Sequence, residues 1–109
     1  HSIAIRRDVM EANPWLPKAV FEAYSKSKAI NLNHMQKLGW AYDTLPWYGQ
    51  EFNDTVALMG KKMYHYGYEV SADSYDTALR YLYEQGLSKR RVTLEEIFAP
   101  SVRSLVEQV

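Results

Sequence analysis

Proline and glycine residues divide this chain into short segments, and no other feature of the sequence constrains its fold as strongly. Proline fits the first turn of a helix because it has no amide hydrogen to leave unpaired, and glycine adopts the left-handed conformation that often follows a helix end. Within the segments, apolar residues recur at three- and four-residue spacing, which is typical of amphipathic helices. The pattern predicts helices at residues 7–13, 15–38, 46–59, 71–86, 93–98 and 101–107, so we expect a mainly helical chain.

Three of the predicted helices carry an apolar stripe. The stripes are Leu16, Val20, Ala23 and Ile30 at residues 15–38; Tyr48, Phe52, Val56 and Met59 at residues 46–59; and Tyr75, Ala78, Leu79, Leu82 and Tyr83 at residues 71–86. The glycines expected to end these helices are Gly39, Gly60 and Gly86. We expect Asn13 to cap the first of them and Ser71 to cap the third. Thr93 and Glu96 have the spacing of a capping box, which predicts a further helix start at Thr93.

The first residues follow a different pattern. Ile3 and Ile5 lie two positions apart in the segment Ser2–Arg6, which is the period of a short β-strand. No later segment has the pattern of a partner strand, and the chain does not begin with methionine. We therefore expect one short N-terminal strand whose sheet is completed by residues outside this chain, as in a fragment of a larger domain.

Composition and charge exclude several classes of protein. Thirteen basic residues balance thirteen acidic ones, so the chain lacks the basic excess that binds nucleic acid phosphates. An apolar content of 47% argues against disorder, and the absence of cysteine removes disulfides, thiolate metal sites and thiol nucleophiles. No apolar run approaches the roughly 18 residues of a membrane span. We expect neither nucleic acid nor a membrane as a partner.

The histidines match no familiar catalytic or metal-binding motif. The H-E-x-x-H pattern of zinc enzymes is absent, and so are the glycine-rich phosphate loops and the G-x-S-x-G nucleophile turn. His34 falls on an apolar stripe and is expected to pack there, whereas His65 lies among tyrosines and either packs locally or lines a site. The sequence therefore predicts no metal site and no bound cofactor.

Other polar and aromatic groups have two interpretations each. Tyr64, Tyr66 and Tyr68 suit packing between lobes or subunits, and they could also offer phenol groups to a polar ligand. Trp15 and Trp47 are expected to anchor the core, and Glu95 and Glu96 to stabilise a helix start.

The basic residues near the two ends also have simple interpretations. Arg6 and Arg7 suit either a carboxylate ligand or an ion pair with Asp8 or Glu11. Lys89, Arg90 and Arg91 are expected in a solvated turn.

Motifs along the whole chain resemble one known family. They are His1–Val9, Glu11–Trp15, Leu45–Trp47, Leu58–Gly60, Tyr66–Gly67, Tyr81, Glu84–Ser88, Arg91–Thr93 and Glu95–Pro100. In this order they resemble the C-terminal part of the 4,5-dihydroxyphthalate decarboxylases. The resemblance implies a two-lobed α/β fold of the type II periplasmic-binding-protein kind. Residues 1–109 would then be a single C-terminal helical fragment that packs on the missing N-terminal lobes.

The resemblance also implies a reaction and a site residue. The family converts 4,5-dihydroxyphthalate, a small aromatic dicarboxylate, to protocatechuate and carbon dioxide. His1 matches the family's histidine at the start of this region, and an imidazole can act as the acid or base that aryl decarboxylation requires. We expect a cytoplasmic enzyme whose isolated fragment is inactive, with no metal or cofactor assigned, and we leave open whether it forms a homo-oligomer.

The sequence is also compatible with two functions other than decarboxylation. A relative of the same family could use its cleft only to bind, as a transporter-type solute-binding protein for a small aromatic or anionic ligand, because fold does not determine function. A freestanding helical interaction domain is the third interpretation. A secretory signal upstream would favour the binding protein, and its absence would favour the enzyme.

Overall fold

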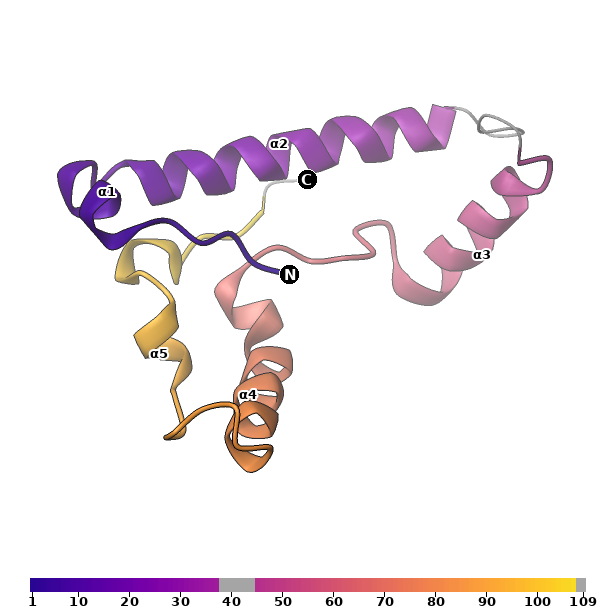
Figure 1. The fold of residues 1–109 in the computed structure, drawn as a ribbon. Helices are drawn as coiled ribbons and strands as arrows, with labels where there is room; N and C mark the ends of the chain where they lie inside the picture. Colours follow the sequence, from indigo (N-terminus) through magenta and orange to yellow (C-terminus); the bar gives the residue numbers. More distant parts are fainter. Residues whose placement is uncertain (38–44, 108–109) are drawn as a thin grey trace.

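The computed structural model describes residues 1–37 and 45–107, which form helices joined by irregular segments (Figure 1). The elements in chain order are α1 Arg7–Ala12, α2 Leu16–Lys37, α3 Tyr48–Met59, α4 Tyr68–Glu84, α5 Leu94–Ile97 and the 3₁₀ helix η1 Pro100–Val102. The predicted helices between residues 7 and 98 are confirmed, with small differences at their ends. The helix predicted at 101–107 is wrong, because η1 ends at Val102 and the following residues form a turn and an irregular segment.

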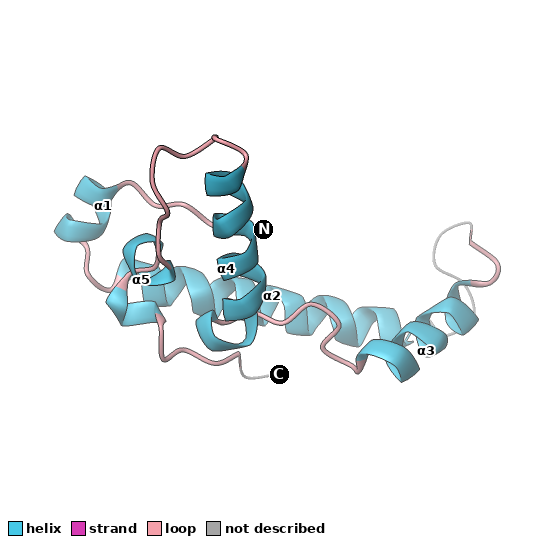
Figure 2. Cartoon of the chain, turned by 90° about the horizontal axis from the view of Figure 1, so that it is seen from below, coloured by secondary structure: helices cyan, strands magenta, loops and turns pink. Residues whose placement is uncertain are grey.

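The predicted N-terminal strand is also wrong. Residues 1–6 are irregular, and the described part of the chain consists of helix and loop (Figure 2). A strand needs a neighbour that pairs with its backbone, and an alternation of two isoleucines does not supply one. The residue pair Gly67 and Val106 forms an isolated antiparallel bridge. The expectation of a strand from a two-lobed α/β fold of the type II periplasmic-binding-protein kind is therefore wrong for residues 1–37 and 45–107, which form helices and loops.

Several predicted caps take other positions. The side-chain amide of Asn13 donates to the carbonyl of Val9 at 3.1 Å, so Asn13 closes α1 and does not cap α2. Ser71 lies inside α4, because the helix starts one turn earlier, after Gly67. Thr93 is the residue before α5 as predicted, but its side chain makes no capping hydrogen bond to the helix.

The glycine helix ends are confirmed where the structure describes them. Gly60 follows α3 with a φ of 79°, and Gly86 follows α4 with a φ of 73°. These positive angles strain residues that carry a Cβ atom, which explains why the glycine positions predicted the two helix ends. Gly39, the third predicted terminator, lies outside the described residues.

A small apolar core joins α4 and α5. Leu79 on α4 and Leu94 on α5 are buried, and the two helices lie against each other. Phe98, just after α5, presents its ring edge-on to Tyr75 at 5.0 Å and to Tyr68 at 5.5 Å between centroids, a favourable geometry for aromatic rings. The stripe predicted for this helix is confirmed only at Tyr75 and Leu79, because Ala78, Leu82 and Tyr83 are exposed.

The protected face of α2 differs from the predicted stripe. Leu16 and Val20 of the predicted stripe are half-buried, but Ala23 and Ile30 are exposed. Along the whole helix a different row of residues is protected, at four- and three-residue spacing: Pro17, Phe21, Ser25, Lys28, Leu32 and Met35. Since η1 lies against α2, it and the segment that follows it select this face. This face contains the polar residues Ser25 and Lys28, so the spacing of apolar residues did not identify it.

The molecule is extended for its length. Its radius of gyration is 17.4 Å, whereas a compact domain of this size would have about 13 Å. In both views α3 lies apart from α4 and α5 (Figures 1 and 2). The predicted core anchors Trp15 and Trp47 are 64% and 75% exposed, so that prediction is wrong. Among the residues described, no helix is long and apolar enough to cross a membrane.

We expect the substitution Leu79→Ala to lower the free energy of unfolding by about 2 kcal/mol, since it leaves a cavity where a buried leucine packs. Urea denaturation followed by circular dichroism measures the change. Leu82→Ala, at an exposed position on the same helix, is the matched control and should change the free energy by less than about 0.5 kcal/mol. Equal effects of the two substitutions would contradict the proposed core.

Candidate functional site

Two enclosed charged groups of the described residues form an ion pair. Lys28 Nζ lies 2.8 Å from Glu107 Oε2 and 3.1 Å from Glu107 Oε1, so it contacts both carboxylate oxygens. The two side chains are only 10% and 3% exposed. Lys28 comes from the middle of α2, and Glu107 lies 79 residues further along the chain. The pair therefore ties the irregular segment after η1 to α2.

The loop between α3 and α4 completes the surroundings of this ion pair. Lys28 Nζ also donates to the backbone carbonyl of Tyr64, and it lies 4.6 Å from the centroid of the Tyr66 ring. His65 Nδ1 lies 3.7 Å from Glu107 Oε1. We name Lys28, Tyr64, His65, Tyr66 and Glu107 the Lys28 cluster. It brings together α2, the loop between α3 and α4, and the irregular segment after η1.

The Lys28 cluster is built to hold a carboxylate. An ammonium group faces both oxygens, and the His65 imidazole adds a second positive charge when it is protonated. Because little solvent reaches Lys28 and Glu107, their attraction is weakly screened. The desolvation of two charges opposes this gain, and the carbonyl and ring contacts of Lys28 partly replace its lost hydration.

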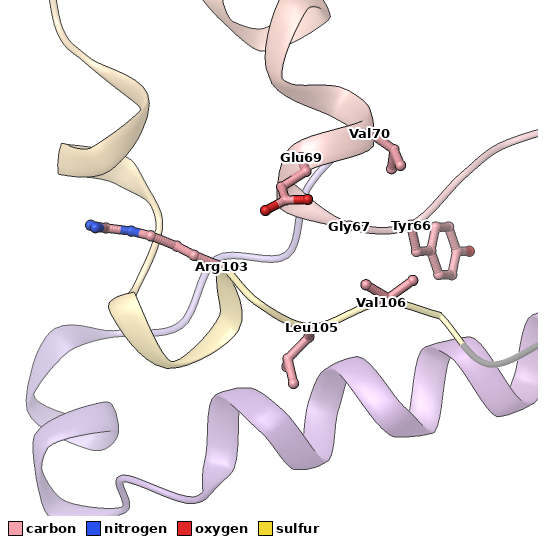
Figure 3. A pocket seen from close by; sticks show the side chains of 7 residues that line it. All are labelled: Tyr66, Gly67, Glu69, Val70, Arg103, Leu105 and Val106. Atoms are coloured by element: carbon pink, nitrogen blue, oxygen red, sulfur yellow. The ribbon is translucent and has the colours of Figure 1, made fainter.

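A shallow hollow lies beside the Lys28 cluster (Figure 3). Its lining residues are Tyr66, Gly67, Glu69, Val70, Arg103, Leu105 and Val106. The side chain of Arg103 extends away from Tyr66 and Val106, so its charge does not point into the hollow. The volume is about 30 Å³, which is room for water and too little for a benzene ring.

A second polar cluster lies where α4 meets α5. The hydroxyl of Tyr68 donates to Glu95 Oε1 at 3.3 Å, and the Arg103 guanidinium donates to the carbonyl of Glu95. The pKa of the Glu95 carboxyl is lowered, first by a hydrogen bond from its own backbone amide and then by Thr93, Tyr68 and the nearby charge of Arg103. Desolvation and the negative charge of Glu95 raise the pKa of Tyr68. This cluster stabilises an ionised carboxylate next to a neutral phenol.

We expect Tyr68→Phe to raise the pKa of Glu95, because the phenol that hydrogen-bonds the ionised carboxylate is lost. Because the pKa of Glu95 is lower in the folded than in the unfolded state, the ionised carboxylate stabilises the folded state at pH values above the unfolded pKa. This stability is lost as the pH falls through the folded pKa. The substitution should make the loss of stability at low pH smaller. Carboxyl ¹³C chemical shifts recorded against pH measure the change, and Tyr83→Phe on the same helix is the control. An unchanged Glu95 titration would refute the assignment.

A hydrogen bond joins His1 to a residue outside the Lys28 cluster. Its backbone carbonyl accepts a hydrogen bond from the Tyr75 hydroxyl at 2.8 Å, and its side chain is exposed. The N-terminus is thereby attached to α4 through Tyr75, whose ring packs against Phe98. The described residues hold no group of three or more potential ligands that could bind a metal ion.

The structure also places the other polar and aromatic residues singled out in the sequence. Arg6 forms an ion pair with Asp8 at 2.9 Å, one of the two predicted arrangements. His65 faces Glu107, whereas His34 is exposed on α2. The basic turn is solvated as predicted, with Arg90 paired to Glu96 at 2.7 Å and Arg91 to Asp76 at 3.2 Å. Tyr64 is exposed, and Tyr66 and Tyr68 are half-buried.

Sequence reasoning missed Lys28 and Glu107. The available signal was the position of Lys28 on α2, where it continues the spacing of Phe21, Ser25 and Leu32. A lysine at such a position requires a buried partner. No local pattern identifies Glu107 as that partner.

Comparison with known proteins finds a relative of this chain. Over 101 residues the chain is 32% identical to the 4,5-dihydroxyphthalate decarboxylase of Comamonas testosteroni. The alignment covers 93% of this chain and 31% of that protein, so the chain spans about a third of the relative it matches. No family model and no solved structure matches. The resemblance found in the motifs is thus confirmed: nearly the whole chain is similar to part of a 4,5-dihydroxyphthalate decarboxylase, a share consistent with its C-terminal portion.

Proposed function

We propose that these residues form the C-terminal part of a larger enzyme that converts 4,5-dihydroxyphthalate to protocatechuate and carbon dioxide. The observation that carries the proposal is the 32% identity to a decarboxylase of this name over 93% of the chain. We place the enzyme in the cytoplasm, where cell fractionation would find its activity.

The exposed apolar side chains support a larger protein. Trp47, Leu58 and Leu87 are 75%, 87% and 72% exposed, and large exposed apolar groups favour burial against other protein surface. The matched relative contains about twice as many residues outside the aligned part as within it. In this proposal the remainder of the polypeptide covers these side chains and supplies the rest of the substrate site.

The reaction needs a proton at the ring carbon that loses the carboxylate. The hydroxyl para to this carbon releases electron density into the ring, and an acid protonates the carbon. The bond from that carbon to the carboxyl group then breaks, its electron pair returns to the ring, and carbon dioxide leaves. His1 is our candidate for this acid, or for the base at the hydroxyl, because imidazole exchanges protons near neutral pH and the His1 side chain is exposed.

The test uses the complete polypeptide that contains these residues. We expect it to form protocatechuate and carbon dioxide in a one-to-one ratio from 4,5-dihydroxyphthalate, measured by chromatography and by trapping of the gas. A protein that binds the substrate without forming product would instead support the solute-binding alternative. The 109-residue chain alone should form no product, and measurable protocatechuate from it would contradict the division of the site proposed here.

A further inference from the structure

We propose that Lys28 and His65 form a binding site for the carboxylate of a small aromatic acid, and that Glu107 occupies this site in the structure as an internal competitor. The choice of an aromatic acid rests on the proposed function. The existence of a carboxylate site rests on the Lys28 cluster itself.

The contacts of Glu107 are those that a carboxylate ligand would make. Lys28 Nζ reaches both carboxylate oxygens, at 2.8 and 3.1 Å, and His65 Nδ1 faces one of them at 3.7 Å. Lys28 is held in place by the carbonyl of Tyr64 and the ring of Tyr66, so it remains directed at this position if Glu107 leaves. An ammonium group with an imidazole beside it recognises a carboxylate by charge and geometry.

The surroundings suit an aromatic ligand. The ring of Tyr66 lies beside the ammonium group, and Tyr64 next to it is 75% exposed. Aromatic rings offer an apolar face on which a benzene ring can stack. The loop that carries both tyrosines also carries His65, so one segment supplies charge and aromatic surface together.

The segment that carries Glu107 is held by few contacts. Residues 103–107 contain neither helix nor strand. Arg103 is anchored to the carbonyls of Phe98 and Glu95, whereas the part that carries Glu107 is held by the isolated bridge between Gly67 and Val106, a backbone hydrogen bond from Leu105 to Val102 and the ion pair itself. Val106, next to Glu107, is 68% exposed. Such segments open locally at a lower free energy than the whole molecule. Because the Glu107 carboxylate occupies the contacts of Lys28, the ligand binds only after Glu107 has moved out.

This competition predicts a gain of affinity when Glu107 loses its charge. The apparent affinity of a ligand falls in proportion to the fraction of molecules with an open site. If Glu107 occupies the site in nine molecules of ten or more, Glu107→Gln should bind phthalate at least about tenfold more tightly than the natural protein. Glutamine keeps the volume of the side chain and an oxygen acceptor for Lys28.

The experiment follows the His65 imidazole signal of the complete polypeptide by nuclear magnetic resonance during titration with phthalate. We expect half-saturation at a concentration at least tenfold lower in Glu107→Gln, and no comparable shift with phthalamide, which has the same shape and no charge. Glu22→Gln is the matched control, because it removes an exposed carboxylate that pairs with another lysine of α2. Equal half-saturation in the natural protein and Glu107→Gln, or an equal response to phthalamide, would overturn the proposal.

A second measurement needs no variant. Saturating phthalate should increase amide hydrogen exchange at residues 103–107 of the natural protein, since the bound acid displaces this segment. Unchanged or decreased exchange there would overturn the proposal even if Glu107→Gln does not fold. Both readouts are independent of turnover: decarboxylation without these responses refutes only the Lys28 site, and these responses without decarboxylation refute only the proposed enzyme.

Discussion

Replacing Lys28 by methionine is expected to lower the free energy of unfolding by about 3–5 kcal/mol, because the substitution leaves the Glu107 carboxylate buried without its partner. A native domain has only about 5–15 kcal/mol of stability in total, so this single change removes a large part of it. Urea denaturation at neutral pH measures the loss. The effect is large because Glu107 is 3% exposed and recovers hydration only when its segment leaves α2, which also gives up the bridge between Gly67 and Val106.

The same helix supplies a control. Lys18 pairs with Glu22 at 3.6 Å, but both side chains are mostly exposed, and exposed pairs of this spacing contribute about 0.3–0.5 kcal/mol. Lys18→Met should therefore cost no more than this. The double substitution Lys28→Met with Glu107→Leu should recover most of the lost stability, because it removes both buried charges. A double variant no more stable than Lys28→Met would contradict the account.

Local signals were sufficient to predict α1 to α5, but not to exclude the helix at residues 101–107, which the structure lacks. Gly60 and Gly86 mark helix ends because their positive φ angles disfavour other residues, and these constraints act within one turn of the chain. The start of α4 was misplaced because Ser71 is a good capping residue by type. Its preference was overridden by Gly67, which is held next to Val106 by the isolated bridge.

Contacts between distant residues were not predictable in the same way. The protected face of α2 is selected by η1 and the segment after it, about 70 to 80 residues further along, and this face includes the polar residues Ser25 and Lys28. A periodicity analysis that counts only apolar residues places the stripe on another side. The prediction of an N-terminal strand was wrong because Ile3 and Ile5 have the period of a strand, but no other strand among the described residues pairs with this segment.

The two candidate groups have different physical support. His1 depends on the resemblance to the decarboxylases, which is carried by sequence identity over most of the chain. Lys28 and Glu107 depend on geometry alone, and neither was suggested by a motif. Independent experiments on the two groups therefore test different statements: one concerns the chemistry of the reaction, and the other concerns the recognition of a carboxylate.

For His1, we expect His1→Asn in the complete polypeptide to lower kcat by at least about 100-fold, the smaller end of the range for loss of a general acid or base. Asparagine keeps a polar side chain but cannot transfer a proton. The fold at this position should be retained, because the Tyr75 hydroxyl contacts the backbone carbonyl of residue 1 and not the imidazole. Steady-state formation of protocatechuate measures kcat and KM separately.

The dependence of kcat on pH distinguishes proton transfer from a purely structural role. A catalytic imidazole gives the natural enzyme a rate change near neutral pH that His1→Asn lacks, whereas a structural histidine leaves the shape of the profile unchanged. His34→Asn is the matched control, since it makes the same substitution at an exposed position on α2 and should leave kcat within about twofold of the natural value. Natural turnover in His1→Asn would show that the proton comes from another group, and the search would then turn to the rest of the polypeptide.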